Sequence, residues 1–150
     1  MSLAEEVALL RKIPIFANVD AAKLKLLAFT SERLTFETGQ ALFNQGDLGD
    51  AAYIVVEGQA DVLIATPKGP VKVATLGRNA IVGEIAILCD VPRTATVVAA
   101  SHLVTLKIVK QTFLQLVSEF PEMAIEIMRE LARRLDRTTE QLRQAVSAKA

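Results

Sequence analysis

The spacing of hydrophobic and polar residues changes twice along this chain and divides it into three parts. Apolar residues recur at helical spacing in Leu3–Arg11 and in Ala21–Phe29, and Asp20 is suited to cap the second helix. From Leu34 to Val109 the pattern becomes short runs of β-branched and aromatic residues, separated by turns that hold all seven glycines. Beyond Lys110 the spacing is helical again. We therefore expect a mainly β fold with flanking helices.

Short strands are predicted throughout the central part. Many short strands joined by glycine turns at nearly regular spacing are typical of a jelly-roll-like β-roll, or double-stranded β-helix. We expect the roll over about 30–109, within one domain that spans 1–150. The predicted strands are Arg33–Glu37, Ala41–Phe43, Ala52–Glu57, Ala60–Ala65, Val71–Leu76, Thr94–Ala99 and His102–Val109.

Two C-terminal helices, over about 111–145, are predicted after the roll. They are Gln111–Glu119 and the long Glu122–Ala145, which starts just past Pro121. A stripe at alternating steps of four and three along the long helix has the a/d spacing of a coiled coil, which needs a facing partner. It predicts a homodimer through this helix, unless the stripe packs onto the roll of its own chain. The stripe consists of Ala124, Met128, Leu131, Leu135, Thr138, Leu142 and Ala145.

Composition and charge narrow the function classes. Lys plus Arg equal Asp plus Glu at 17 each, so nothing favours binding to a polyanion. A single cysteine and a single histidine cannot form an intrachain disulfide or a zinc or iron–sulfur site, so we expect no metal and no cofactor. No apolar run approaches the roughly 18–20 residues of a membrane span, and no secretory signal is visible at the start. The expected location is the cytoplasm.

Two isolated charges of opposite sign lie in apolar surroundings. Glu84 is the one charge in Val82–Leu88, and Arg93 is the one charge in Val91–Val98. Burying either without a partner is costly, so each must meet the other, solvent or a ligand. An internal Glu84–Arg93 ion pair beside a glycine turn is one solution. A cyclic nucleotide is the other, because an arginine fork holds its phosphate and a carboxylate accepts from its ribose 2′-hydroxyl.

The segment Val82–Thr96, which reads VGEIAILCDVPRTAT, resembles the phosphate-binding cassette of the cyclic nucleotide-binding domain family. The family pattern is an aromatic or aliphatic residue, Gly, Glu, aliphatic, Ala, aliphatic, several variable positions, then Arg, a small residue, Ala, and Ser or Thr. Phe43–Asp47 and Asp50–Gly58 also look like early β-roll turns of that family, so the resemblance covers roughly 13–144. Val82 departs from it by standing where the family often has Phe.

The resemblance implies roles for individual residues. Backbone groups of Gly83, Glu84, Ile85, Ala86 and Ala95 would surround the phosphate and ribose, with side-chain roles for Glu84, Arg93 and Thr94. Gly83 permits a positive φ, and a short helical turn that begins near Glu84 would point unpaired N–H groups at the phosphate. The residues expected to bind ligand here are Gly83, Glu84, Ile85, Ala86, Arg93, Thr94 and Ala95. An apolar slot for the base, equally consistent with plain core, would come from Val71, Val73, Leu76 and Ile81.

The run LARRLDRTTE at 131–140 looks like the dimer helix of catabolite-activator-type regulators. There a hydroxyl pair at the positions of Thr138 and Thr139 contacts adenine across the dimer interface, which favours cAMP, whereas Thr94 resembles members that favour cGMP. Arg134 and Arg133 could add charge near the phosphate or simply be solvated. No helix-turn-helix follows, so this chain alone is not expected to bind DNA.

The sequence thus predicts a sensor that binds a cyclic nucleotide and moves its C-terminal helix, without catalysis, to signal to an effector protein of unknown kind. A cyclic-nucleotide phosphodiesterase would need metal ligands that one histidine cannot supply. Two alternatives remain. The chain could be the sensor part of a longer transcription regulator or channel, or a β-roll interaction domain that binds no nucleotide.

Overall fold

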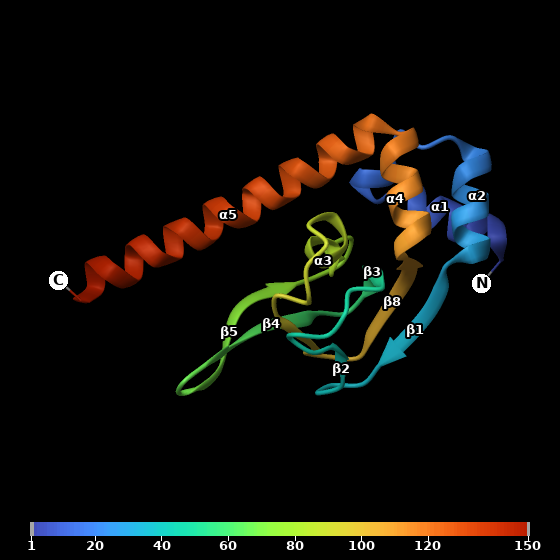
Figure 1. Cartoon of the computed structure of the whole chain (residues 1–150). Helices are drawn as coiled ribbons and strands as arrows, with labels where there is room; N and C mark the ends of the chain where they lie inside the picture. Colours follow the sequence, from blue (N-terminus) through green and yellow to red (C-terminus); the bar gives the residue numbers. More distant parts are fainter. Residues whose placement is uncertain (1, 150) are drawn as a thin grey trace.

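A β-roll forms the centre of the protein in the computed structural model, which describes residues 2–149. Two four-stranded antiparallel sheets make the roll, ordered β1-β8-β3-β6 and β2-β7-β4-β5 (Figure 1). The strands are β1 (Glu32–Phe36), β2 (Ala41–Phe43), β3 (Ala51–Glu57), β4 (Ala60–Thr66), β5 (Gly69–Leu76), β6 (Ile81–Val82), β7 (Thr96–Ala99) and β8 (Leu103–Val109). The helices are α1 (Leu3–Arg11), the 3-10 turn η1 (Pro14–Phe16), α2 (Ala21–Thr30), α3 (Glu84–Leu88), α4 (Lys110–Glu119) and α5 (Pro121–Lys149).

Strand β3 is buried on both faces and separates two cores. Its successive side chains point to opposite sides of the sheet, so Ala52, Ile54 and Val56 join one cluster while Ala51, Tyr53 and Val55 join the other. This is why β3 reads as an unbroken apolar run rather than as an alternating one. The second cluster lies between the two sheets, close to the apolar segment that carries Glu84 and Arg93.

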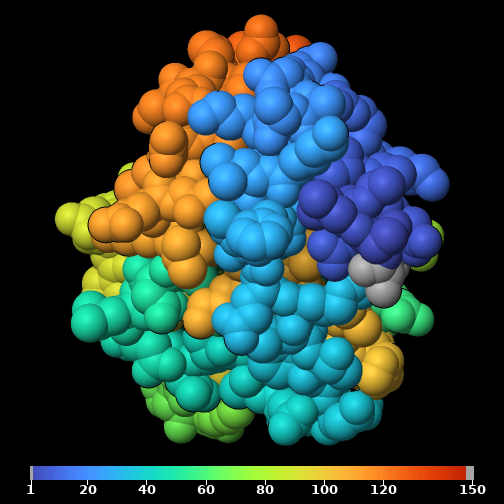
Figure 2. All heavy atoms as spheres, turned by 90° about the vertical axis from the view of Figure 1, so that its right-hand side faces the viewer, coloured from blue at the N-terminus to red at the C-terminus, as the bar shows by residue number. Residues whose placement is uncertain are grey.

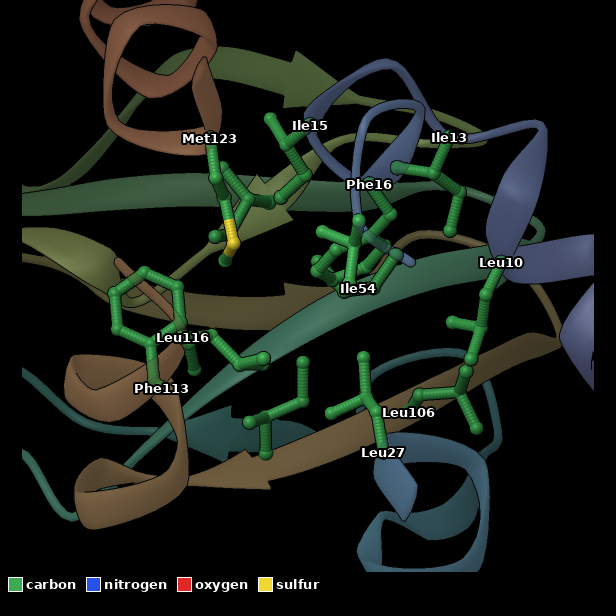
Figure 3. Close-up of a cluster of buried hydrophobic side chains, with 14 of the residues drawn as sticks. Leu10, Ile13, Ile15, Phe16, Leu27, Ile54, Leu106, Phe113, Leu116 and Met123 are labelled. Carbon is green, nitrogen blue, oxygen red and sulfur yellow. The ribbon is translucent and has the colours of Figure 1, made fainter. Parts of the chain in front are cut away.

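The first core joins the sheet to the helices. Figure 3 shows Ile54 and Leu106 of the sheet among side chains of α2, α4 and α5, including Leu27, Phe113 and Met123. Each fully buried side chain of this size contributes roughly 1.5–3 kcal/mol. Helices α1 and α2 lie side by side at one end of the molecule with α4 beside them (Figure 2). The start of α5 is therefore fixed to the core, and the helix then runs along the roll past α3 (Figure 1).

The prediction of a β-roll with N-terminal helices and a long C-terminal helix is confirmed. Asp20 caps α2 as expected, because its carboxylate accepts from the Lys23 N–H at 2.9 Å. Strand β6 was not predicted, since two apolar residues that continue into a helix show no strand periodicity. Strand β7 begins at Thr96 rather than at Thr94. Within 2–149, no helix is both long and apolar enough to cross a membrane.

Candidate functional site

Gly83 makes the turn from β6 into α3 in a left-handed conformation, with φ of 86°. A Cβ added there would lie 2.6 Å from Nη1 of Arg93 and 3.2 Å from the Phe43 ring, so only glycine fits. The first N–H groups of α3 have no partner inside the helix, as at any helix start. The turn therefore presents backbone donors next to a guanidinium.

Arg93 is a buried cation whose polar atoms are incompletely paired. Its side chain is fixed by two backbone carbonyls, since Nη1 donates to the Gly83 oxygen at 2.8 Å and Nη2 to the Ala51 oxygen at 2.7 Å. The guanidinium also lies over the Phe43 ring, 4.0 Å from its centroid. Its Nε is buried without a hydrogen-bond partner, and its nearest carboxylate, the exposed Asp50, is 3.6 Å away. A buried charge in this state favours an added anion.

Burial also shifts the acid–base balance of both charged groups. Desolvation lowers the pKa of Arg93, although nearby Tyr53 and Asp50 act to raise it. Desolvation raises the pKa of Glu84, which is 1% exposed, while the positive charge of Arg134 opposes that rise. Both shifts follow from burial, since Glu84 and Arg93 are only 1% and 3% exposed.

Arg134 of α5 reaches across to the start of α3. Its Nη1 donates to Oε1 of Glu84 at 2.8 Å, and its Nη2 donates to the carbonyl of Ile81. Its Nε lies 3.4 Å from Oε1 of Glu130 on its own helix. The alternative of an internal Glu84–Arg93 ion pair is therefore wrong, because each of these side chains has other partners. Of the two arginines singled out by sequence, Arg134 is at the site and Arg133 pairs with Glu130 at 3.2 Å instead.

A small cavity of about 80 Å³ lies where these groups converge. It opens beside a groove of about 380 Å³ between β4, β5 and α5, and the two share several residues. The small cavity is lined by Phe43, Val62, Leu76, Val82, Gly83, Glu84, Ile85, Ala86, Arg93, Thr94, Ala95, Val97 and Arg134. The groove is lined by Val62, Ile64, Val73, Ala74, Thr75, Leu76, Ile85, Thr94, Ala95, Arg134, Arg137, Thr138 and Gln141.

The structure thus brings most of the expected site residues together. All seven cassette residues and Arg134 line the small cavity, and Thr138 lines the groove, whereas Thr139 lines neither. Of the expected apolar slot, Val73 and Leu76 line the groove and Ile81 belongs to the core. Val71 lines neither cavity.

Sequence reasoning missed Phe43, Arg137 and Gln141 as lining residues. The helical spacing of Arg134, Thr138 and Gln141 could have indicated a shared face. No sequence signal placed Phe43 under the arginine.

The apolar stripe of α5 differs from its predicted register. Met128, Leu135 and Leu142 are exposed at 60%, 67% and 64%, but Leu131 packs against the core and Thr138 faces the groove. The exposed residues at alternating steps of three and four are Ile125, Met128, Ala132, Leu135, Thr139, Leu142 and Val146. The expected packing onto the roll of its own chain is therefore found for one edge of the stripe, at Leu131, while the other edge is uncovered within the described side chains.

Comparison with known proteins decides the family. A model described as the cyclic nucleotide-binding domain matches residues 33–120. The chain belongs to this family. A cAMP-dependent protein kinase regulatory subunit from Mucor circinelloides f. lusitanicus is 35% identical over 107 residues, which is 71% of this chain and 25% of that protein. The chain thus spans about a quarter of the length of this relative.

Solved structures agree on the domain. The catabolite activator protein of Thermus thermophilus is 28% identical, with a TM-score of 0.73, over 89% of this chain and 63% of that chain. A regulatory subunit of a cAMP-independent protein kinase A from Trypanosoma cruzi, bound to guanosine, has a TM-score of 0.78 at 23% identity, over 99% and 51% of the two chains. At that identity the likeness shows the fold alone.

Among the described residues of this cyclic nucleotide-binding domain, no group of three or more His, Cys, Asp or Glu side chains could hold a metal ion.

Proposed function

We propose that this cyclic nucleotide-binding domain binds a 3′,5′-cyclic nucleotide, cAMP in preference to cGMP, and signals by moving α5 without catalysing a reaction. The observation that carries the proposal is Arg93, which is 3% exposed, retains an unpaired buried Nε and has no carboxylate within hydrogen-bond distance. A ring phosphate is a compact monoanion that supplies the missing counter-charge. The donor-rich turn at Gly83 adjoins the same cavity.

The phosphate would be held by backbone and side chain together. N–H groups at the start of α3, from Ile85 and Ala86, and that of Ala95 would donate to its oxygens beside the Arg93 guanidinium. Thr94 lines both cavities, so its hydroxyl is available to the phosphate or to the base. A lysine could not replace Arg93, because an ammonium lacks the planar fork.

Glu84 would read the ribose and connect it to α5. Glu84 lines the small cavity, and its carboxylate accepts a hydrogen bond from Arg134 of α5. A 2′-hydroxyl that donates to this carboxylate changes the interaction between Glu84 and Arg134. The ligand therefore interacts differently with two positions of α5, which is what coupling between binding and helix movement requires.

Helix α5 would both contact the base and form the dimer interface. Thr138 lines the groove of its own chain, while Thr139 lies on the uncovered stripe. A second copy packed along that stripe would form a homodimer and bring its own Thr139 toward the interface, as the resemblance to catabolite-activator-type regulators implies. The signal would then pass to an effector protein that the chain does not identify.

Isothermal titration of the full chain tests the proposal with cAMP, cGMP, guanosine and linear 5′-AMP. We expect both cyclic nucleotides to bind, cAMP more tightly, and the other two to bind more weakly. Arg93→Ala should cost roughly 2–5 kcal/mol of binding free energy, because a desolvated anion loses its counter-charge. Arg133→Ala, which removes an arginine one residue from the site residue Arg134, is the matched control. Guanosine binding as tightly as the cyclic nucleotides, or equal affinity in Arg93→Ala, would overturn the phosphate role.

The ribose role has its own test. Glu84→Ala should weaken cAMP more than it weakens 2′-deoxy-cAMP, since the deoxy ligand has no hydroxyl to lose. Equal losses for the two ligands would remove Glu84 from the ribose role and leave the role of Arg93 untouched.

A further inference from the structure

The Arg93 guanidinium lies on an aromatic ring. Its central carbon is 4.0 Å from the centroid of the Phe43 ring. Its Nη1 and Nη2 donate to the carbonyls of Gly83 and Ala51, at 2.8 Å and 2.7 Å. A Cβ added to Gly83 would lie 3.2 Å from the same ring, so the ring, the guanidinium and the glycine turn pack together. The backbone thus holds two of the donors of the guanidinium, and the ring contacts the cation itself.

The backbone of Arg93 is bonded to the loop that follows Phe43. Phe43 is the last residue of β2. The Gly46 N–H donates to the Arg93 carbonyl at 2.8 Å, and the Arg93 N–H donates to the Asp47 carbonyl at 2.7 Å. The ring itself packs against Tyr53, with centroids 6.0 Å apart. Since Arg93 is fixed to the segment that carries the ring, the contact between ring and guanidinium follows from the path of the chain.

No carboxylate within residues 2–149 is hydrogen-bonded to the Arg93 side chain. The nearest carboxylate, that of Asp50, is 75% exposed and lies 3.6 Å from Nη2. The Glu84 carboxylate accepts from Arg134 instead. An aromatic face attracts a cation through its quadrupole, and does so more strongly when the cation is desolvated. The ring carries no net charge, so it stabilises Arg93 and leaves the positive charge uncompensated.

We propose that Phe43 is a positioning residue whose ring holds the Arg93 cation at the small cavity without neutralising it; the inference rests on the proposed function. A carboxylate in the place of the ring would give Arg93 an internal counter-ion and would repel the ligand phosphate. The ring does neither. Phe43 therefore maintains both the position and the charge of the group that binds the phosphate.

Asp50 is the group that competes for Arg93 once the ring is removed. Its Oδ1 lies 3.6 Å from Nη2, so a small movement of the guanidinium brings the two within hydrogen-bond distance. Such an ion pair supplies the negative charge that the phosphate otherwise supplies. Loss of the ring should therefore weaken nucleotide binding through Asp50, and removal of the Asp50 carboxylate should restore it.

Isothermal titration of the full chain with cAMP tests the role of the ring. Phe43→Leu keeps an apolar side chain and removes the aromatic face, so it should raise the cAMP dissociation constant about 5- to 10-fold. Replacement of Phe43 by pentafluorophenylalanine keeps the ring and reverses the charge of its face, and should weaken binding at least as much. Phe36→Leu is the matched control, because Phe36 packs against the same core cluster as Phe43 and lines neither cavity.

A double-mutant cycle separates positioning from packing. In the wild-type background Asp50→Asn should change the cAMP dissociation constant by less than about 2-fold, since the carboxylate is exposed. In the Phe43→Leu background it should recover most of the lost affinity, about 3-fold or more, because the competing carboxylate is gone. A ring that acted only by filling space would give the same Asp50→Asn effect in both backgrounds.

The outcomes separate the inference from the function on which it rests. The inference is overturned, and the proposed function stands, if the wild type binds cAMP and any of three results is found. These are a Phe43 variant that binds as tightly as the wild type, an equal loss in Phe36→Leu, and an Asp50→Asn effect that is the same in both backgrounds. If the wild type binds no cyclic nucleotide, both are overturned. Thermal unfolding shows whether each variant is folded, and if Phe43→Leu is not, the pentafluorophenylalanine variant decides.

Discussion

The cassette around Gly83 and the C-terminal half of α5 are built in opposite ways. In the cassette, Glu84 and Arg93 are almost fully buried and bonded to backbone or to another charge. In α5, every described side chain in 135–147 is exposed, and the helix projects beyond the roll (Figure 1). Arg134, which donates to Glu84, links α5 to the cassette. The first region is thus held by contacts of buried side chains, whereas the side chains of the second are exposed.

The largest effect is expected when the glycine turn of the cassette is altered. Gly83→Ala places a Cβ at φ of 86° and 2.6 Å from the Arg93 guanidinium. The left-handed conformation alone should lower the free energy of unfolding by about 1–2 kcal/mol, and displacement of Arg93 should weaken cAMP binding at least tenfold, or about 1.4 kcal/mol. Urea unfolding and calorimetry measure the two effects.

Gly77→Ala is the matched control for that turn, because Gly77 has no positive φ and an added Cβ would meet nothing within 4 Å. If both alanine variants bind cAMP as the wild type does, the turn at Gly83 does not position Arg93 for the ligand.

A substitution in the exposed half of α5 should weaken dimerisation and leave the stability of the folded monomer nearly unchanged. Leu135→Glu introduces a charge at the centre of the uncovered stripe, where a facing helix would bury it. We expect the dissociation constant of the proposed dimer to rise about 10-fold or more, about 1.4 kcal/mol, with the stability of the monomer changed by less than about 0.5 kcal/mol. Analytical ultracentrifugation measures the first quantity.

Gln144→Glu adds the same charge to α5 away from the stripe. Dissociation constants that rise equally in both variants would mean that this stripe is not the dimer interface.

The fold was largely predictable because its signals are local. Glycine turns and runs of β-branched residues mark strands such as β3 wherever they lie in space. The left-handed turn at Gly83 is likewise encoded by one residue. Strand β6 was missed because it has only two residues, Ile81 and Val82, and its partners are in β3.

The sequence predicted which residues form the site but not which groups they hydrogen-bond. Glu84 and Arg93 are conspicuous as lone charges in an apolar segment, and the family resemblance assigned them roles. Their actual partners were not foreseen, since Arg134 is 50 residues from Glu84 and the Ala51 carbonyl is 42 residues from Arg93. Such contacts depend on how sheets and helices pack. The groove face of α5 was foreseen only in part, since Arg134 and Thr138 were expected at the site but Arg137 and Gln141 were not.

The contact between the two regions should be sensitive to pH through Glu84. Burial holds the folded-state pKa of this carboxyl above its ordinary value of 4.5. The stability that protonation contributes is therefore fully present below the unfolded-state pKa and is lost as pH rises through the folded-state pKa. Relative to Glu84→Gln, the wild-type free energy of unfolding should fall by about 1.4 kcal/mol for each pH unit between the two pKa values.

Urea unfolding from acidic to neutral pH measures this difference. Glu122→Gln, which removes an exposed carboxylate from the first turn of α5, is the control and should not reproduce it. A difference between wild type and Glu84→Gln that stays constant with pH would contradict the burial argument.

The smallest effect is expected at the rim of the cassette, where Asp50 is 75% exposed and lies 3.6 Å from Nη2 of Arg93. An exposed carboxylate contributes at most about 1 kcal/mol to such a pair, and it also repels an incoming phosphate. Asp50→Asn should therefore leave folding nearly unchanged and tighten cAMP binding by a few tenths of a kcal/mol, an effect that shrinks as salt is added because exposed charges are screened. Calorimetry at low and high ionic strength measures it. Weaker binding in Asp50→Asn would mean that the carboxylate positions Arg93 for the ligand.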